Sequence, residues 1–210
     1  MTDTITIAID GPAASGKGTI ARRVAEELGL RHLDTGMLYR GVAALVQEQG
    51  LFPSDGEAAG RVAEELTVDV LERSDLRNAG IGNIASIVAA HPQVRTALLD
   101  WQRNFALSGA VVDGRDIGTV VLPNATAKLF VTAEIDVRAA RRWRELSKDG
   151  DIAYRIVKEQ LEDRDARDEE RAISPMTHAE DAALIDTTEM SIDEAVAQAL
   201  QLINKEIQAA

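Results

Sequence analysis

One stretch near the start of the chain, I-D-G-P-A-A-S-G-K-G-T at residues 9–19, constrains the fold more than any other feature. It nearly matches the phosphate-binding pattern G-x-x-x-x-G-K-[ST], with both glycines and Lys17 in place. The last position differs, because Gly18 stands where a hydroxyl is expected and Thr19 follows one residue later. The stretch is therefore either a phosphate loop with a displaced hydroxyl or a plain turn between two elements.

The sequence on both sides of this stretch favours the phosphate loop. The β-branched run at residues 5–10 predicts a buried strand, and apolar residues at helical spacing predict a helix over 17–28, ended by Gly29. Glycines between a strand and a helix let backbone N–H groups approach phosphate oxygens, and the helix N-terminus adds positive potential. The predicted loop residues are Gly11, Pro12, Ala13, Ala14, Ser15, Gly16, Lys17, Gly18 and Thr19.

The rest of the chain alternates short apolar runs with helical patterns. Strands are predicted at 32–36, 109–114, 127–133 and 183–188, and helices at 37–49, 92–107, 135–147, 152–167 and from Ser191, where Glu194 completes a capping box. This alternation predicts an α/β fold with a five-stranded parallel sheet and helices on both faces. Residues 51–90 have a weak apolar pattern and are interpreted as an inserted lobe, in which 67–73 is the remnant of a small sheet.

Length and composition limit the class of protein. The 210 residues suffice for a single domain, expected here to act as a monomer, and the absence of cysteine excludes disulfides and thiolate zinc sites. The net charge of -12 disfavours nucleic acid and anionic membranes as partners. The first ten residues lack a positively charged segment, so no secretory signal is expected and a cytoplasmic location is predicted.

Several classes of phosphate-loop protein fit poorly. Guanine-nucleotide switches carry an N-K-x-D run, which this sequence lacks. The L-S-G-A run at 107–110 resembles the signature of transporter ATPases, but it lies directly before a predicted strand in a chain that is too short. Shikimate-type kinases place Ser or Thr directly after the lysine, where this chain has glycine.

Four further motifs narrow the match. The G-K-G-T form is that of nucleoside monophosphate kinases, and it is followed by L-D-T-G-M-L-Y-R-G (33–41), V-V-D-G-R-D-I-G-T-V-V-L-P (111–123), R-D-A-R-D-E-E-R (164–171) and I-D-T-T (185–188). Together these motifs resemble the bacterial cytidylate kinase family from about residue 4 to residue 205. The resemblance implies transfer of the γ-phosphoryl group of ATP to CMP or dCMP.

The same resemblance implies a domain plan within the P-loop kinase fold. A core at 1–50, 91–135 and 175–210 would carry a monophosphate-binding insertion at about 51–90 and a helical lid at about 140–170. Between residues 138 and 171 there are ten Lys or Arg and ten Asp or Glu, against thirteen and twenty-five elsewhere. Basic charge is thus concentrated where a lid would close over phosphates.

The chemistry requires charge neutralisation rather than a base. A phosphate acceptor is already largely dianionic near neutral pH, since its second pKa is about 6. The three histidines, His32, His91 and His178, have no obvious partners in the sequence and are interpreted as structural. Arginine suits the task because its planar fork binds phosphate oxygens bidentately.

The resemblance assigns the catalytic and ATP-binding roles. The residues expected to act in catalysis are Lys17, Asp113, Arg115, Arg164 and Arg171. Thr19, and Asp113 through water, would hold Mg²⁺. Arg141 and Arg142 match lid arginines for the ATP phosphates, although each is equally consistent with a surface charge. Arg164, Arg167 and Arg171 would share one face of a continuous helix.

The resemblance also assigns the acceptor site. The expected residues are Thr35, Tyr39, Arg40, Ser86, Arg95, Arg115, Asp116, Arg164, Asp168 and Arg171. Asp116 would accept a hydrogen bond from the cytosine amino group, which uracil lacks, and Asp168 would lie near the ribose hydroxyls. Thr35 replaces the more usual serine.

Three alternatives stay open. The segment between Tyr39 and Ser86 is shorter than in the long family members, so the choice between CMP and dCMP is undetermined. The acceptor could instead be UMP, AMP or a non-nucleotide alcohol. The chain could also be an inactive nucleotide-binding module, a reading that intact Lys17 and Asp113 disfavour.

Overall fold

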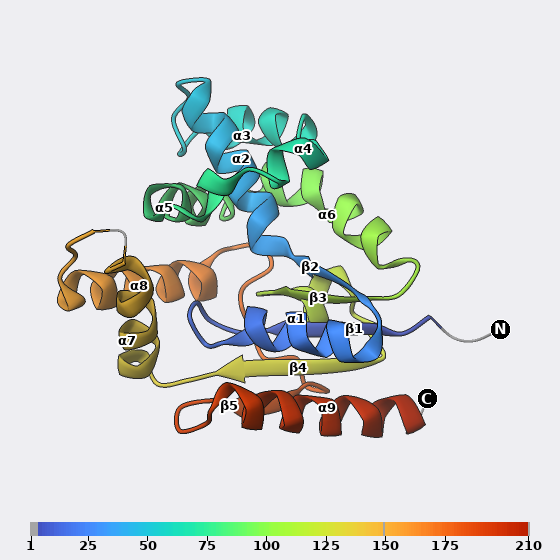
Figure 1. Ribbon diagram of the computed structural model, residues 1–210. Coiled ribbons are helices and arrows are strands. Elements are labelled where there is room, and N and C mark those ends of the chain that lie inside the picture. Colours follow the sequence, from blue (N-terminus) through green and yellow to red (C-terminus); the bar gives the residue numbers. More distant parts are fainter. Residues whose placement is uncertain (1–3, 149, 210) are drawn as a thin grey trace. The chain divides into compact units, whose positions relative to one another are not determined.

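The computed structural model describes residues 4–148 and 150–209 (Figure 1). The chain divides into two compact units, one formed by Met1–Leu33 with Phe105–Ala210 and the other by Asp34–Asn104. The expected insertion at 51–90 lies inside the second unit. Within the described ranges, no helix is both long and apolar enough to cross a membrane.

A five-stranded sheet forms the centre of the first unit. Its strands are β1 (Thr6–Asp10), β2 (Arg31–Asp34), β3 (Ala110–Gly114), β4 (Ala127–Thr132) and β5 (Ala183–Asp186), in the order β2-β3-β1-β4-β5. β1 pairs in parallel with β3 and with β4, and β4 pairs in parallel with β5. The sheet predicted from the alternating pattern is therefore confirmed.

The register of the two central strands determines where the site lies. Asp10 is the partner of Gly114 in the β1–β3 ladder, so both strands end at the same edge of the sheet. The chain leaves β1 into the phosphate-loop sequence and leaves β3 into the G-R-D sequence. Parallel pairing thus brings two motifs about a hundred residues apart to one edge.

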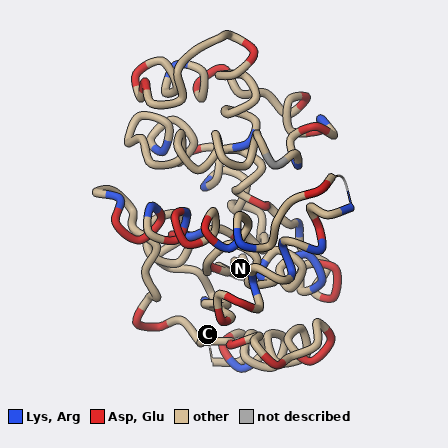
Figure 2. The backbone as a smooth tube through the Cα atoms, turned by 90° about the vertical axis from the view of Figure 1, so that its left-hand side faces the viewer, with Lys and Arg blue, Asp and Glu red and all other residues tan. Residues whose placement is uncertain are grey.

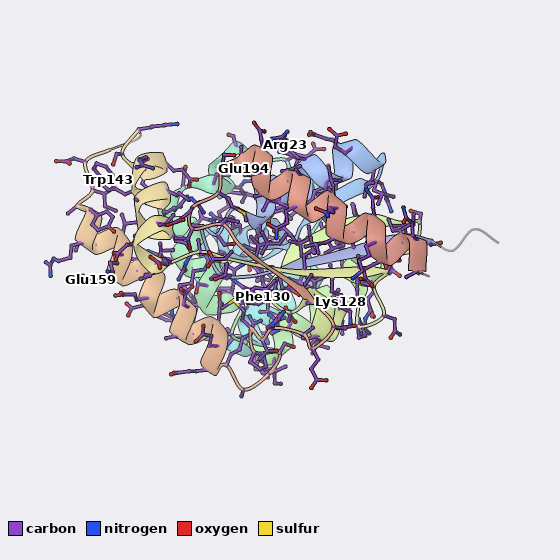
Figure 3. All side chains as sticks on the ribbon, turned by 90° about the horizontal axis from the view of Figure 1, so that it is seen from below. Arg23, Lys128, Phe130, Trp143, Glu159 and Glu194 are labelled. Atoms are coloured by element: carbon purple, nitrogen blue, oxygen red, sulfur yellow. The ribbon has the colours of Figure 1, made fainter. Side chains whose placement is uncertain are left out.

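Helices α1 (Lys17–Leu28) and α9 (Ile192–Ala209) pack on the sheet. Their apolar faces share a core with the strands that includes Ile7, Ile9, Ile20, Ile185 and Ile203, all fully buried. Arg23 of α1 forms an ion pair with Asp193 at the start of α9, near the labelled Glu194 (Figure 3). The predicted capping box is confirmed, because Ser191 and Glu194 exchange side-chain to backbone hydrogen bonds.

Two further helices of the first unit pack against each other. These are α7 (Ile135–Leu146) and α8 (Tyr154–Glu170), and a short π-helical turn, η2 (Ile117–Val121), follows β3. Val157 and Leu161 of α8 form a small apolar cluster with Ala139 of α7 and Ala13 of the phosphate-loop sequence. Apolar packing therefore joins the α7–α8 segment to the loop.

The second unit is helical. It contains α2 (Thr35–Glu48), α3 (Gly56–Glu64), α4 (Val68–Leu71), η1 (Ser74–Arg77), α5 (Ala79–Val88) and most of α6 (Pro92–Ala106). The small sheet expected at 67–73 is wrong, because the helical turn α4 occupies that segment. A Cβ placed at Gly41 would lie 2.8 Å from Leu66 and 3.1 Å from Leu71, so the glycine lets this turn pack closely on α2.

Candidate active site

The loop between β1 and α1 has the backbone geometry of an anion-binding turn. Gly11 has φ +144°, and a Cβ there would lie 2.0 Å from the Val131 carbonyl oxygen, so only glycine fits. Gly16, with φ +92°, caps the N-terminus of α1. Lys17 begins the helix and its Nζ donates to the Pro12 carbonyl oxygen at 3.4 Å. Glycine, lysine and a helix N-terminus therefore meet at one loop.

Asp113 lies next to this loop. It is the β3 residue paired with Ile9 and is 3% exposed. A Cβ built on Gly18 would lie 3.8 Å from Asp113 Oδ1, so the carboxylate faces the first turn of α1. Gly18, which replaces the usual Ser or Thr after the lysine, thus stands where any side chain would approach the Asp113 carboxylate.

His32 is a partner of Asp113. Its Nε2 lies 2.7 Å from Asp113 Oδ2. The sequence showed no obvious partner for this histidine, and the structure supplies one, a proposed site residue 81 positions away. His91 and His178 bond to the carbonyl oxygens of Pro53 and Ala182.

The surroundings of Asp113 fit a magnesium ion held mainly by phosphates. The described residues contain no group of three or more His, Cys, Asp or Glu side chains able to hold a metal. Mg²⁺ needs no such cage, because it binds through one or two protein oxygens, substrate phosphates and water. A buried carboxylate facing the first turn of α1, where Thr19 lies, matches that donor set.

The arginines of the predicted acceptor site form a buried cluster with two aspartates. Arg115 Nε donates to Asp168 Oδ2 at 2.8 Å, and Arg164 approaches the same oxygen at 3.9 Å. Arg171 lies 3.5 Å from Asp116 and 3.9 Å from Asp168. Five of the proposed residues, two from the motif at 111–123 and three from the motif at 164–171, are thus brought together. α8 extends to Glu170, three residues beyond the predicted end at 167, so Arg164 lies on the helix and Arg171 directly follows it.

The cluster shifts the protonation equilibria of its members. Burial would raise the pKa of Asp168, but the charges of Arg115, Arg164 and Arg171 outweigh it and lower that pKa. Burial alone would lower the pKa of Arg115, and Asp168 reverses this and raises it. Both groups are therefore charged near neutral pH.

Arginines of α7 contact the phosphate loop and the chain after β5. Arg141 donates to the hydroxyl and the carbonyl of Thr187, whose own hydroxyl donates to the Ser15 carbonyl oxygen at 2.8 Å. Arg142 forms an ion pair with Glu145 on the surface. Figure 2, turned so that α7 and α8 face the viewer, shows basic and acidic residues alternating along this segment.

Arg138 is a residue that the sequence reasoning missed. It is 7% exposed, donates to the carbonyl oxygens of Ala133 and Ala13, and pairs with Asp165 at 2.6 Å. It therefore links the phosphate loop to α8. The sequence offered one clue to Arg138, since it lies three residues before Arg141 and so on the same helix face. Basic and acidic residues are mixed along this helix, however, and their pattern does not show which arginine is buried.

The second unit holds the other predicted acceptor-site residues. Thr35 is buried at the start of α2, and Arg40 donates to the Leu76 carbonyl oxygen at 2.8 Å. The Arg95 guanidinium lies over the Tyr39 ring, 5.6 Å from its centroid. Ser86 on α5 is 4% exposed. Arg95 is itself 8% exposed and is not a surface charge.

Comparison with known proteins decides the family. The family described as cytidylate kinase matches residues 7–205. The chain belongs to the cytidylate kinase family. It is 54% identical over 200 residues to a cytidylate kinase of Xanthobacter autotrophicus, covering 94% of this chain and 96% of the relative. It is 50% identical over 203 residues to that of Paramagnetospirillum magneticum, covering 94% and 96%.

Solved structures share the fold of this cytidylate kinase family member. An uncharacterized protein from Eubacterium ventriosum aligns with a TM-score of 0.61 at 16% identity, covering 97% of this chain and 99% of that one. A gluconokinase from Sinorhizobium meliloti aligns with a TM-score of 0.51 at 15% identity, covering 100% and 97%. The P-loop kinase fold expected from the sequence is confirmed.

Proposed function

We propose that this enzyme transfers the γ-phosphoryl group of ATP to CMP or dCMP, producing ADP and CDP or dCDP. Membership of the cytidylate kinase family supports this activity. The structural observation that carries it is the joining of the phosphate loop and a buried arginine–aspartate cluster at one edge of the sheet. The rival acceptors UMP and AMP are not favoured by the family match.

The donor is held by the loop. The backbone N–H groups of residues 11–19 and the N-terminus of α1 would bind the ATP phosphates. The ammonium group of Lys17 would stay close to the γ-phosphoryl group and neutralise its charge during the transfer. Arg141 and Arg142, on α7, would add to the positive charge around the donor. When bound, Mg²⁺ neutralises negative charge on the phosphate oxygens, and Thr19 and Asp113 would hold it.

The acceptor is held by arginines. Arg115, Arg164 and Arg171 would bind the CMP phosphate, whose repulsion from ATP must be offset before the two anions can approach in line. Asp116 would read the cytosine amino group, and Asp168 would contact the ribose while it pairs with the arginines. In the second unit, Thr35, Tyr39, Arg40, Ser86 and Arg95 would complete the recognition of the acceptor nucleotide.

The two anions react without a protein base. The acceptor phosphate is ionised in water near neutral pH, so the protein contributes charge neutralisation and alignment. We propose that residues 140–170 act as a lid that excludes water and suppresses hydrolysis of ATP. Residues 51–90 would be the monophosphate-binding insertion, carried with the lid on a core of residues 1–50, 91–135 and 175–210.

Product analysis tests this function. ³¹P NMR of a mixture of enzyme, Mg-ATP and CMP should show the phosphate signals of ADP and CDP growing at equal rates. ADP and inorganic phosphate without CDP would mean hydrolysis instead of transfer. No product from CMP, dCMP, UMP or AMP, despite ATP binding, would support an inactive nucleotide-binding module.

A further inference from the structure

Asp10 has a buried carboxylate that the proposed chemistry does not use. It is the last residue of β1, directly before the phosphate loop, and is 5% exposed. Its Oδ1 accepts a hydrogen bond from the Ile117 N–H and its Oδ2 from the Gly118 N–H, both at 2.8 Å. These donors lie 107 and 108 residues further along the chain, so Asp10 bonds to the segment that follows β3 and not to its own loop.

The two N–H groups belong to the first residues of η2. The first N–H groups of a helical turn have no acceptor inside the turn, and an anion there also meets the positive end of the peptide dipoles. The Asp116 carbonyl oxygen starts this turn by accepting from the N–H groups of Val120 and Val121. Asp10 therefore fixes the backbone immediately after Asp116.

The fixed segment is the one that presents two acceptor-site side chains. Arg115 Nε donates to Asp168 Oδ2, and Asp116 lies 3.5 Å from Arg171. The backbone of the turn is thus held by Asp10 of β1. Its two side chains are held by Asp168 of α8 and by Arg171, which directly follows α8. Loss of the backbone contact would leave the side-chain contacts to set its position alone.

An ionised Asp10 carboxylate is unfavourable at this buried position unless its hydrogen bonds serve a purpose. Burial, with a smaller effect of Asp116, raises the pKa of Asp10 to about 6, although the N–H groups of Gly118 and Ile117 and the charge of Arg115 oppose the shift. A Cβ on Gly118 would lie 3.4 Å from Asp10 Oδ2 and 3.1 Å from Cδ of Lys128, labelled in Figure 3, so the glycine permits the close approach.

Two acceptor atoms are needed because two N–H groups point at one side chain. An asparagine offers a single oxygen, and its NH₂ group would face one of the backbone N–H groups. A side chain that only filled the space would require no carboxylate. The two hydrogen bonds from the Ile117 and Gly118 N–H groups therefore require the two carboxylate oxygens of Asp10.

We propose that Asp10 is a positioning residue that sets the Arg115–Asp116 turn for binding of the acceptor nucleotide. This inference rests on the proposed function, since it takes the acceptor to contact that turn. The C-terminal end of β1 would then have two roles. The strand leads into the donor loop and, through this carboxylate, aligns the acceptor turn.

Steady-state kinetics of Asp10→Asn test the inference. ADP formation is measured with CMP varied at saturating ATP and with ATP varied at saturating CMP. The KM for CMP should rise about tenfold or more, while the KM for ATP changes by less than about twofold, because the variant leaves a backbone donor at the acceptor turn poorly paired. A residue needed only for stability would not separate the two constants.

Thr126→Val is the matched control. The Thr126 hydroxyl accepts from the Thr6 N–H at the opposite end of β1, at 3.1 Å, so this variant also removes an acceptor of a β1-linked backbone hydrogen bond. It should lower the melting temperature and leave both KM values within about twofold.

Two results would overturn the inference. Equal rises in both KM values would place the effect at the phosphate loop, and unchanged KM values would make Asp10 purely structural. If Asp10→Asn does not fold, Asp10→Glu keeps the charge, displaces the oxygens by one methylene and should show the same separation of constants. Failure of wild-type enzyme to phosphorylate CMP would overturn the proposed function itself, whatever the variants do.

Discussion

Arg115 Nε donates to Asp168 Oδ2 across 2.8 Å, and the two side chains are 14% and 7% exposed. The pair joins the turn after β3 to α8, so it links two motifs of the sequence inside the first unit. Buried ion pairs add little net stability, but removal of one partner leaves an uncompensated charge. We infer that the pair holds Arg115 in position for the phosphate of the proposed acceptor.

Asp168→Asn should destabilise the protein by about 3 kcal/mol, because Arg115 would remain buried without its carboxylate. Urea unfolding monitored by circular dichroism measures the change. Asp163→Asn, an exposed aspartate on the same helix, is the control and should change the free energy of unfolding by less than about 0.5 kcal/mol. Equal effects of the two variants would show that Asp168 does not compensate the charge of the buried Arg115.

Lys17→Ala should lower kcat by about a hundredfold or more, because the loop loses the mobile charge that offsets the transferred phosphoryl group. The far-ultraviolet circular dichroism spectrum should stay that of the wild type. Lys205→Ala, at an exposed position on α9, should keep full activity. A Lys17→Ala variant with wild-type kcat would show that the Lys17 side chain does not contribute to the transfer step.

Asp116→Ala should reduce kcat/KM for CMP by about 10- to 100-fold, the loss expected when one polar contact to a base edge is removed. The dissociation constant of ATP, measured by isothermal titration calorimetry, should change little. The preference for CMP over UMP should narrow in the same variant. Equal losses for CMP and ATP would argue against a role of this carboxylate in base recognition.

The pKa of Asp10 predicts how stability varies with pH. Because that pKa is raised from 3.8 to about 6 in the folded protein, the folded state binds the proton more tightly than the unfolded state. The resulting stabilisation is full below pH 3.8 and is lost as the pH rises through about 6. Between pH 4.5 and 7.5 the loss should amount to about 2 kcal/mol.

The difference in unfolding free energy between Asp10→Asn and wild type isolates this effect, since asparagine does not titrate. Relative to wild type, the variant should gain about 2 kcal/mol of stability from pH 4.5 to 7.5, measured by urea unfolding at each pH. A constant difference would mean that Asp10 titrates normally. Activity is a poorer probe, because the phosphate of CMP titrates in the same range.

Local pattern was enough to predict most of the fold. Helix α1 has the predicted bounds because its apolar spacing and Gly29 act locally, and α6 begins at Pro92 as expected. The prediction for 67–73 was wrong because the valines and the leucine in this segment resemble the pattern of a strand. Close packing against α2 at Gly41 favours a helical turn instead, which is a tertiary effect that no short window contains.

The sequence supplied the residues of the proposed site but not the contacts among them. One motif supplied Arg115, and another supplied both Asp168 and Arg171. The parallel register of β1 and β3 explains why the G-R-D turn lies beside the phosphate loop. The contact of His32 with Asp113 and the bonds from Asp10 to η2 span 81 and more residues. They depend on strand register and side-chain direction, which the sequence pattern leaves undetermined.

The central claim is that this chain phosphorylates a cytidine monophosphate. Its most direct test is the kcat/KM of the wild-type enzyme for CMP, dCMP, UMP, AMP and shikimate at saturating Mg-ATP, with ADP formation followed in a coupled assay. We expect the highest values for CMP or dCMP, with UMP and AMP at least about tenfold lower and shikimate unused. A higher kcat/KM for AMP or UMP than for both cytidine nucleotides would contradict it.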